Sequence, residues 1–486
     1  MRILQLASEA VPFAKTGGLG DVVGAITRHL ASVGHEVDLI LPYYRAIARA
    51  ERADDRPPSV RFAPSALGTS GEGRLVSGPP LDGARTWFVD VPELFDRDGL
   101  YGAGDGDHPD NLQRFAAFVR AALLAAERLE LAPDIVHCHD WQTALAPAWL
   151  TGADAAPTVF TIHNLAYQGW FPATDRGSAD VAPGAGPRLP GAGDLHLLRV
   201  GLTSADQVTT VSPTYASEIL QPEFGFGLDE LLRDLRPPVV GILNGIDTEV
   251  WNPADDPYLP DGWQVGDMAG KRSARVTLAD AFGIDAPSGT PVFGLVSRLV
   301  EQKGLGLLEE LQPRIAAWRE ARFVLLGTGE VRYERLLEEL SELPHVGARV
   351  AFDERLAHLV EGGSDFFLMP SKFEPCGLNQ MISQRYGTLP IVHRTGGLAD
   401  TVTSVDAKTI ADGSATGIVF EHFDAAGLEW AIREAMRLYA DPASYALVQA
   451  AAMRLDHSWN ARIAAHERLY ERVRATPAGV HRDTTL

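Results

Sequence analysis

The sequence predicts an α/β protein built from two doubly wound domains. Two series of short apolar strands each lead into polar residues, and helical stretches separate most of these strands. The first series begins at residue 2 and the second near residue 290, with a proline- and glycine-rich join expected around residues 245–290. Because open parallel sheets bind ligands beyond the carboxyl ends of their strands, two such domains predict a ligand shared across a cleft.

The first strand–helix–strand unit can be followed along the chain. The apolar run RILQLAS, from residue 2, is typical of a buried parallel strand, and EVDLILP (36–42) is the next strand. Gly34 is the expected stop of the helix between them. Apolar residues recur there at helical spacing, namely Val22, Val23, Ile26, Leu30 and Val33.

The loop FAKTGGLGDVVG (13–24) lies between that strand and that helix. It is not a P-loop, because Lys15 and Thr16 precede the glycines instead of following them. It also departs from the dinucleotide fingerprint G-x-G-x-x-G, since Val23 occupies the third glycine position and Gly24 comes one residue late. From its sequence alone, the loop is a candidate for binding phosphate, but it matches neither the P-loop nor the dinucleotide motif.

The remaining strands place polar side chains at their carboxyl ends. PDIVHCHDW, PTVFTIHN, DQVTTVS and PVVGILNG belong to the first domain, and PVFGLVSRL, ARFVLLGTGE, SDFFLMPSKFEP and LPIVHRTGG to the second. The polar groups and glycines expected at these ends are Lys15, His139, Asp140, His163, Asn164, Asn244, Ser297, Arg298, Gly327, Glu374 and Thr395. A glycine- and proline-rich stretch at 183–193 is expected to be a surface loop.

Composition excludes several classes of protein. The net charge is −21, so sequence-independent binding to nucleic acid is not expected. Two cysteines, Cys138 and Cys376, exclude a disulfide framework and a zinc cluster. We find no signal-like N-terminus and no apolar stretch of membrane-spanning length, so a cytoplasmic protein without a membrane partner is expected.

Two segments of the second half are candidates for phosphate and sugar binding. In SRLVEQKGL, Arg298 and Lys303 could clamp a diphosphate, although two solvated surface cations are the alternative. In KFEPCGLNQ, a helix beginning near Gly377 could bind phosphate and Glu374 could accept hydrogen bonds from sugar hydroxyls; an ordinary loop carboxylate is the alternative. RTGGLAD (394–400) is a second candidate for a glycine-rich helix start that a ligand could approach closely; a plain tight turn is the alternative.

The histidines admit both catalytic and structural interpretations. His163, at the end of a strand, is more often a structural residue than a catalyst. Alternation along HCHDW puts His137 and His139 on one face, but a third ligand at suitable spacing is lacking, so a metal site is not expected. The acidic stretch DGD (105–107) is interpreted as a flexible loop, not as a metal-binding motif.

Taken in order, these motifs resemble a known family. KTGGLGDV, HCHDW, FTIHNLAYQG, TTVSPTYASEI, ILNGID, SRLVEQKG, LLGTGE, FEPCGLNQ, YGTLPIVHRTGGLADTV and TGIVF are similar to motifs of bacterial glycogen synthases and plant starch synthases. These are retaining glycosyltransferases with two Rossmann-like domains, the GT-B fold. The resemblance implies domains at 1–245 and 246–458, a helix at 459–475 that crosses back to the first domain, and a flexible tail at 476–486.

The resemblance also implies an activity. It implies that glucose is transferred from ADP-glucose to the non-reducing end of an α-1,4-glucan, glycogen, and that no metal or other cofactor is needed. His163, Arg298, Lys303 and Glu374 are the implied catalytic residues. The implied donor-binding residues are Lys15, Gly17, Gly18, Asp140, Asn244, Ser297, Phe352, Cys376, Gly377, Leu378, Thr395 and Gly396.

Some positions depart from the family pattern. Phe352 stands where relatives often carry a tyrosine against the adenine, and Asn379 where a threonine is common. The Gly/Pro-rich segment replaces an aromatic, helical stretch that many relatives carry, which affects the expected acceptor contacts. The alternatives are a related glucosyltransferase that uses UDP-glucose or another acceptor, a non-catalytic glucan-binding protein, and a dehydrogenase.

Overall fold

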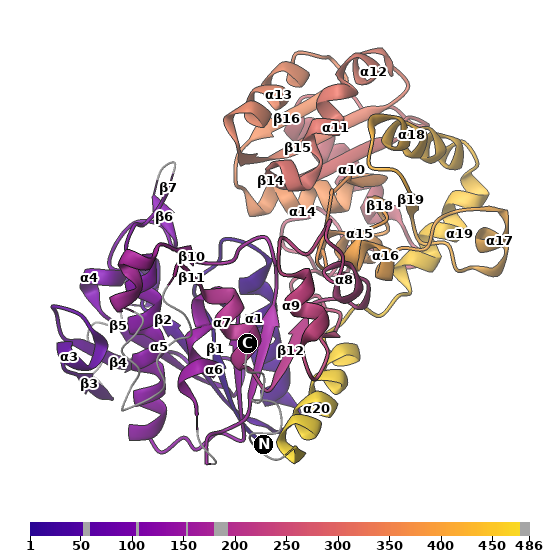
Figure 1. Cartoon of the computed structure of the whole chain (residues 1–486). Coiled ribbons are helices and arrows are strands. Elements are labelled where there is room, and N and C mark those ends of the chain that lie inside the picture. The colour runs from indigo at the N-terminus through magenta and orange to yellow at the C-terminus, as the bar shows by residue number, and fades with distance from the viewer. Residues whose placement is uncertain (52–58, 104–105, 152–153, 179–192, 477–486) are drawn as a thin grey trace. The chain divides into compact units, whose positions relative to one another are not determined.

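The computed structural model describes residues 1–51, 59–103, 106–151, 154–178 and 193–476 (Figure 1). The chain forms two compact units: unit 1 comprises Met1–Asn244 and Trp459–Leu486, and unit 2 comprises Gly245–Ser458. The loop expected at 183–193, except for its last residue, and the tail expected at 476–486, except for its first residue, lie outside the described residues. Among the described helices, none has the length and apolar character needed to cross a bilayer.

Unit 1 is built on a nine-stranded sheet with the order β13-β12-β9-β8-β1-β2-β5-β4-β3. The sheet is parallel from β13 to β5, whereas β4 and β3 extend it as antiparallel strands. Its strands are β1 (Arg2–Leu6), β2 (Glu36–Pro42), β3 (Val60–Phe62), β4 (Gly73–Ser77), β5 (Arg85–Asp90), β8 (Ile135–His139), β9 (Thr158–Ile162), β12 (Gln207–Thr210) and β13 (Val240–Gly241). Two small antiparallel pairs lie outside it, β6 (Gly102–Ala103) with β7 (Gly106–Asp107) and β10 (Trp170–Phe171) with β11 (Leu195–His196).

The helices of unit 1 connect these strands. They are α1 (Gly18–Ser32), α2 (Arg45–Glu51), α3 (Pro64–Leu67), α4 (Pro92–Phe95), α5 (Asn111–Arg128), α6 (Leu145–Trp149), α7 (Leu197–Ser204), α8 (Pro213–Glu218) and α9 (Asp229–Asp234), with 3₁₀ turns η2 (Trp141–Thr143) and η3 (Ala173–Ser178). The predicted helix is α1, and its apolar positions are buried apart from Val33. Val33 lies past the last helical residue and is 46% exposed, because the helix has already ended there.

The C-terminal helix α20 (Asn460–Ala475) is part of unit 1, where it contacts α1 and β9 (Figure 1). Tyr470 on this helix is fully buried, and its hydroxyl lies 2.8 Å from Nδ1 of His137 on β8. On the same helix, Glu467 lies 3.0 Å from Nε2 of His35. These contacts join the end of the chain to the core of the first unit.

Unit 2 contains a six-stranded, fully parallel sheet with the order β16-β15-β14-β17-β18-β19. Side chains alternate along it: Phe293 and Leu295 belong to one buried cluster, while Val292 belongs to another. Because both faces are apolar and buried, helices must cover both. The strands are β14 (Val292–Leu299), β15 (Arg322–Gly329), β16 (Val346–Val350), β17 (Phe366–Met369), β18 (Leu389–His393) and β19 (Ile418–Phe420).

The helices of unit 2 follow the same alternating order. They are α10 (Ala269–Phe282), η4 (Glu301–Lys303), α11 (Leu305–Glu310), α12 (Gln312–Ala317), α13 (Val331–Ser341), α14 (Glu354–Gly363), α15 (Asn379–Tyr386), α16 (Gly396–Thr401), α17 (Ala407–Asp412), α18 (Ala425–Tyr439) and α19 (Pro442–Met453). Asp424 and Asp441 accept hydrogen bonds from the first-turn amides of α18 and α19, which explains where those helices begin.

Candidate functional site

Each large sheet has one place where the strand order reverses. In unit 1, β1 leads outward through β2 and β5 on one side, while β8, β9, β12 and β13 follow on the other. In unit 2, β15 and β16 lie on one side of β14, and β17, β18 and β19 on the other. A crevice forms at the carboxyl ends of the strands flanking such a switch point, and ligands bind there. The relevant loops therefore follow β1 and β8 in unit 1, and β14 and β17 in unit 2.

The buried carboxylate of Glu9 holds the loop after β1 in place. Glu9 is 2% exposed and accepts hydrogen bonds from the backbone N–H of Thr16 at 2.5 Å, the Thr16 hydroxyl at 2.7 Å and the Tyr101 hydroxyl at 2.5 Å. Lys15 stays exposed and pairs with Asp21 on α1 at 2.7 Å. The loop is thus fixed by its neighbours while the Lys15 side chain remains exposed and paired with Asp21.

The glycines of this loop have two different functions. A Cβ on Gly24 would lie 2.4 Å from the carbonyl oxygen of Val11, and one on Gly20 would lie 3.0 Å from that of Ala14. Gly20 and Gly24 therefore allow α1 to approach the loop closely. Gly17 precedes the first turn of α1 without a capping side chain, and a Cβ there would meet nothing within 4 Å. The Gly17–Gly18 backbone is accessible to a ligand.

The loop after β8 contains a strained acidic residue. Asp140 has a positive φ of 55°, and its buried carboxylate accepts a hydrogen bond from the backbone N–H of His163 at 2.7 Å. Burial raises the pKa of Asp140 to about 7, although hydrogen bonds from the His163 and Asn164 amides oppose the shift. A non-glycine residue in this conformation costs about 1–3 kcal/mol and is found chiefly at functional sites. The structure thus brings together two of the predicted site residues, Asp140 and His163.

Three histidines of unit 1, His137, His139 and His163, lie next to one another. His137 and His139 share one face of β8, with ring centroids 4.1 Å apart, as the alternation along the strand predicts. His137 contacts the Tyr470 hydroxyl at 2.8 Å and the Thr161 hydroxyl at 2.6 Å, which makes it a satisfied core residue. Burial lowers the pKa of His163 to about 3 and that of His139 well below its ordinary value. Within the described part of the chain, no three His, Cys, Asp or Glu side chains are grouped to hold a metal ion.

In unit 2, the loops after β14 and β17 are joined by an ion pair. Nζ of Lys303 lies 2.6 Å from Oε2 of Glu374, and the Ser371 hydroxyl donates to the same oxygen at 2.9 Å. Glu374 is 6% exposed. Gln302, beside Lys303, donates from its side-chain amide to the carbonyl of Phe373 at 3.2 Å. The predicted cation and the predicted carboxylate are thus brought together at the switch point.

The start of α16 packs directly on the segment around Glu374. The backbone N–H of Gly397 donates to the Glu374 carbonyl at 3.1 Å. A Cβ on Gly396 would lie 2.0 Å from that carbonyl, and one on Gly397 would lie 2.2 Å from the carbonyl of Cys376. These glycines are therefore required for close packing between α16 and the site, beyond any contact with a ligand. Thr395 precedes α16 and is buried.

The other predicted residues lie around these clusters. Arg298 is inside β14 and exposed, not after the strand as the sequence suggested, because β14 continues to Leu299. Its neighbour Ser297 donates to the Arg298 carbonyl at 2.8 Å. α15 begins two residues after Gly377, and its first residue, Asn379, donates to the Val296 carbonyl at 3.3 Å. The remaining positions are Asn244, buried at the end of unit 1; Cys376, buried beside Gly377 and Leu378; and Phe352, 84% exposed beyond β16.

Sequence reasoning missed the residues that support the predicted ones. Glu9, Tyr101 and Ser371 hold Thr16 and Glu374 in place, yet none was named as a candidate site residue, although Ser371 lies within the segment SDFFLMPSKFEP. Glu9 follows the first strand closely, so its position at a strand end was the available signal. Tyr101 had no such signal, because it reaches Glu9 from 92 residues away.

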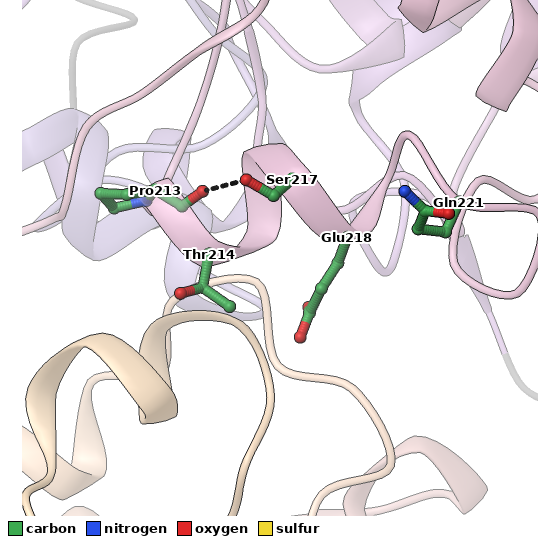
Figure 2. Close-up of a pocket in the computed structure, with 5 residues that line it drawn as sticks. All are labelled: Pro213, Thr214, Ser217, Glu218 and Gln221. Atoms are coloured by element: carbon green, nitrogen blue, oxygen red, sulfur yellow. Dashed lines mark hydrogen bonds between the residues drawn. The ribbon is translucent and has the colours of Figure 1, made fainter.

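An open pocket in unit 1 is lined by none of these residues. Figure 2 shows it along α8, where the Ser217 hydroxyl donates to the Pro213 carbonyl at 3.3 Å. Its lining residues are Pro213, Thr214, Ser217, Glu218 and Gln221, none of which is a predicted site residue.

Comparison with known proteins identifies the family. The starch synthase catalytic domain matches residues 2–234, and the glycosyl transferases group 1 domain matches residues 279–451. The chain is 46% identical over 485 residues to the glycogen synthase of Myxococcus xanthus (strain DK1622), covering 97% of this chain and 99% of that protein. The chain belongs to the glycogen synthase family. The glycogen synthase of Opitutus terrae is 41% identical, covering 97% of this chain and 99% of that protein.

Solved structures agree with this family. The catalytic domain of starch synthase IV from Arabidopsis thaliana, bound to ADP and acarbose, superimposes with a TM-score of 0.87 at 34% identity, covering 98% of this chain and 99% of that chain. A sucrose-phosphate synthase from Thermosynechococcus elongatus, with a TM-score of 0.59 and 18% identity, shares the fold. The predicted fold class, two Rossmann-like domains of the GT-B type, is confirmed. Like other glycogen synthases, the chain is a glucosyltransferase that uses a sugar-nucleotide donor and a glucan acceptor.

Proposed function

We propose that this glycogen synthase homologue transfers glucose from ADP-glucose to the non-reducing end of an α-1,4-glucan with retention of the anomeric configuration. The observation that carries the proposal is the Lys303–Glu374 pair at the switch point of unit 2. A cation and a carboxylate held side by side suit a ligand with an anionic diphosphate attached to a hydroxyl-rich sugar. ADP in the related starch synthase structure supports the choice of nucleotide.

The chemical problem is the departure of a diphosphate from the sugar. Negative charge accumulates on the leaving group, and preorganised cations stabilise it where it develops. We assign this role to Arg298 and Lys303. Lys15 and the Gly17–Gly18 backbone of unit 1 are proposed to contact the diphosphate and the glucose of the donor.

We assign the binding of the donor glucose to Glu374 and to residues of unit 1. Lys303 and Ser371 both donate to Oε2 of Glu374, so we assign Oε1 to the hydroxyls of the donor glucose. The backbone carbonyl of His163 is proposed to face the anomeric carbon, with Asp140 and Asn244 beside the sugar. Ser297 and the Gly377–Leu378 amides are proposed to contact phosphate, and Phe352 to stack on adenine. The other proposed donor-binding residues are Cys376, Thr395 and Gly396.

We assign the retention of the anomeric configuration to a front-face transfer. A double displacement needs a carboxylate nucleophile close to the anomeric carbon. The Asp140 carboxylate accepts the His163 backbone N–H, and Glu374 is bound to Lys303 and Ser371, so neither is assigned as a nucleophile. The acceptor hydroxyl is proposed to attack as the diphosphate leaves, and a departing phosphate oxygen takes its proton.

The proposal includes no metal or other cofactor, because amines and guanidinium groups supply the positive charge. Transfer is therefore expected to continue at full rate in EDTA; a loss restored by Mg²⁺ contradicts this part. Two cysteines and an acidic surface fit the cytoplasm as the site of reaction.

The test is the release of ADP from ADP-glucose, measured with and without glycogen. We expect release to depend on glycogen, and β-amylase to remove the added glucose, because that enzyme cleaves α-1,4 links from non-reducing ends. A parallel assay with UDP-glucose tests the choice of donor. Glycogen binding without ADP release points to a binding protein, and ADP release without glucan points to a hydrolase; either result overturns the proposal.

A further inference from the structure

His139 lies between two polar side chains in the core of unit 1. Its Nε2 is 2.7 Å from Oε1 of Gln5 on β1, and its Nδ1 is 2.9 Å from Nε2 of His163. Gln5 and His139 are 0% and 1% exposed. The contact with Gln5 spans 134 residues of sequence and the one with His163 spans 24, so the sheet order alone brings the three groups together.

These contacts fix where the protons lie. An amide oxygen only accepts, so Nε2 of His139 carries the hydrogen that it donates to Gln5. A neutral imidazole has one N–H, so Nδ1 of His139 is the acceptor and Nε2–H of His163 is the donor. His163 is then also neutral, with its own Nδ1 left as an acceptor.

The surroundings of His139 favour this neutral form. Its ring lies tilted against that of His137 with centroids 4.1 Å apart, and the His163 ring centroid is 5.2 Å away. Burial, followed by the neighbouring imidazoles of His137, His163 and His466, holds the pKa of His139 well below its ordinary value. A protonated His139 has no acceptor nitrogen, so the neutral form is needed for the contact with His163.

We propose that His139 is a positioning residue: set by Gln5 as the Nε2–H tautomer, it accepts the His163 ring N–H and so orients His163 for glucosyl transfer. The inference rests on the proposed function, which places the His163 backbone at the donor's anomeric carbon. Asp140 binds the backbone N–H of His163 at 2.7 Å, and His139 binds its ring. One anchor on the main chain and one on the side chain leave His163 little freedom to rotate.

Two substitutions separate positioning from mere core packing. In His139→Asn, the side-chain Oδ1 is separated from Cβ by the same number of bonds as the Nδ1 of histidine, so it can accept the His163 N–H. In His139→Gln, the polar atoms extend to the place of Nε2, so the contact with Gln5 can survive while the acceptor for His163 is lost. Both variants lose ring packing, so a purely structural role predicts equal effects.

The experiment measures kcat and donor KM for ADP-glucose with glycogen, alongside thermal stability, in both variants and in His137→Gln. His137 is the matched control, since it lies on the same strand and contacts Thr161 and Tyr470. We expect His139→Gln to lose about 10- to 100-fold in kcat with donor KM unchanged, as for a misplaced reacting group. We expect His139→Asn to recover most of that loss. Equal losses in the two variants, no loss in either, or a rise in KM alone overturns the inference.

A second measurement does not depend on activity or on variants that fold. Long-range ¹H–¹⁵N spectra of the histidine-labelled wild-type chain report which ring nitrogen carries the proton. We expect Nε2–H for both His139 and His163 at neutral pH, and a proton on Nδ1 of His139 or a charged ring overturns the inference. An inactive wild type instead counts against the proposed function, so the two failures are distinguishable.

Discussion

Lys303 and Glu374 form an ion pair of 2.6 Å, and their side chains are 21% and 8% exposed. The two residues lie in the loops that follow β14 and β17 of the same sheet and are 71 residues apart in sequence. Their contact places positive charge and hydroxyl-binding capacity at one point of unit 2. The proposed chemistry depends on this pair more than on any other contact in the unit.

Replacement of Lys303 by alanine tests the stabilisation of the leaving group. We expect kcat/KM for glucosyl transfer to fall by about 10²–10³, the cost of losing one preorganised charge from a developing anion. Arg437→Ala is the matched control, because Arg437 forms an exposed ion pair with Glu434 on α18. That control is expected to keep its rate. An unchanged kcat/KM in Lys303→Ala rules out the leaving-group role.

Glu374→Ala tests the placement of the donor sugar. We expect transfer to fall by several orders of magnitude, because both the sugar contacts and the partner of Lys303 are lost. Glu374→Gln keeps an oxygen acceptor but not the charge, and is expected to retain more activity than the alanine variant. Steady-state kinetics of the two variants decide the point: a mild loss in Glu374→Ala shows that the sugar lies elsewhere.

Gly24→Ala tests the close approach of α1 to the loop after β1. The new Cβ meets the Val11 carbonyl oxygen at 2.4 Å, so backbone must move. We expect a loss of about 1–3 kcal/mol in the free energy of unfolding, measured by urea titration. Gly17→Ala is the control for stability, since nothing lies within 4 Å of its Cβ and its φ of −162° suits alanine. Equal stability of the two variants contradicts the packing argument.

Glu9→Ala tests whether the hydrogen bonds of Glu9 hold the loop that carries Lys15 and Thr16. Without the Glu9 carboxylate, the backbone N–H and hydroxyl of Thr16 lose their acceptor. We expect donor KM to rise about tenfold, equivalent to about 1.4 kcal/mol of binding free energy. Glu93→Ala is a matched control, because Glu93 holds the backbone N–H and hydroxyl of Ser70 in the same way on an exposed loop. If donor KM rises equally in both variants, the loop has no special role.

His466→Gln tests the pH dependence of stability. Burial lowers the pKa of His466 from 6.5 to about 4, so between these values the unfolded chain binds more protons than the folded one. Stability must therefore fall as the pH drops from 6.5 toward 4, by up to about 1.4 kcal/mol per pH unit for this group. His137, His139 and His163 act in the same direction, whereas the raised pKa of Asp140 opposes it.

We expect His466→Gln to lose less stability than the wild type between pH 6.5 and pH 4.5. Urea unfolding at a series of pH values measures this difference. Parallel pH profiles of the two proteins contradict the assignment of the slope to His466.

Local patterns in the sequence predicted much of the fold. The strand EVDLILP is β2 at the predicted bounds, and the glycine-rich loop precedes α1 as expected. The strands β3, β4 and β5 were not predicted, although they complete one side of the sheet of unit 1. Two of them, β3 and β4, join by antiparallel pairing at the sheet edge, outside the alternation of strand and helix that the prediction used.

The candidate site was predicted as residues but not as contacts. Lys303, Glu374, Asp140 and His163 were each named from strand ends and family motifs. Their supporting partners Glu9, Tyr101, Ser371 and Gln5 were not, because a hydrogen-bonding side chain in a strand or loop has no signature of its own.

The sequence by itself determined most of the parallel strands, where the chain turns, and which polar side chains emerge at strand ends. Those properties follow from short-range periodicity and from glycine, which act within a few residues. Only the tertiary structure decided that Lys303 meets Glu374 and that Gln5 meets His139. Such pairs depend on the order of strands in the sheet, and that order is set by the burial of whole faces rather than by any local pattern.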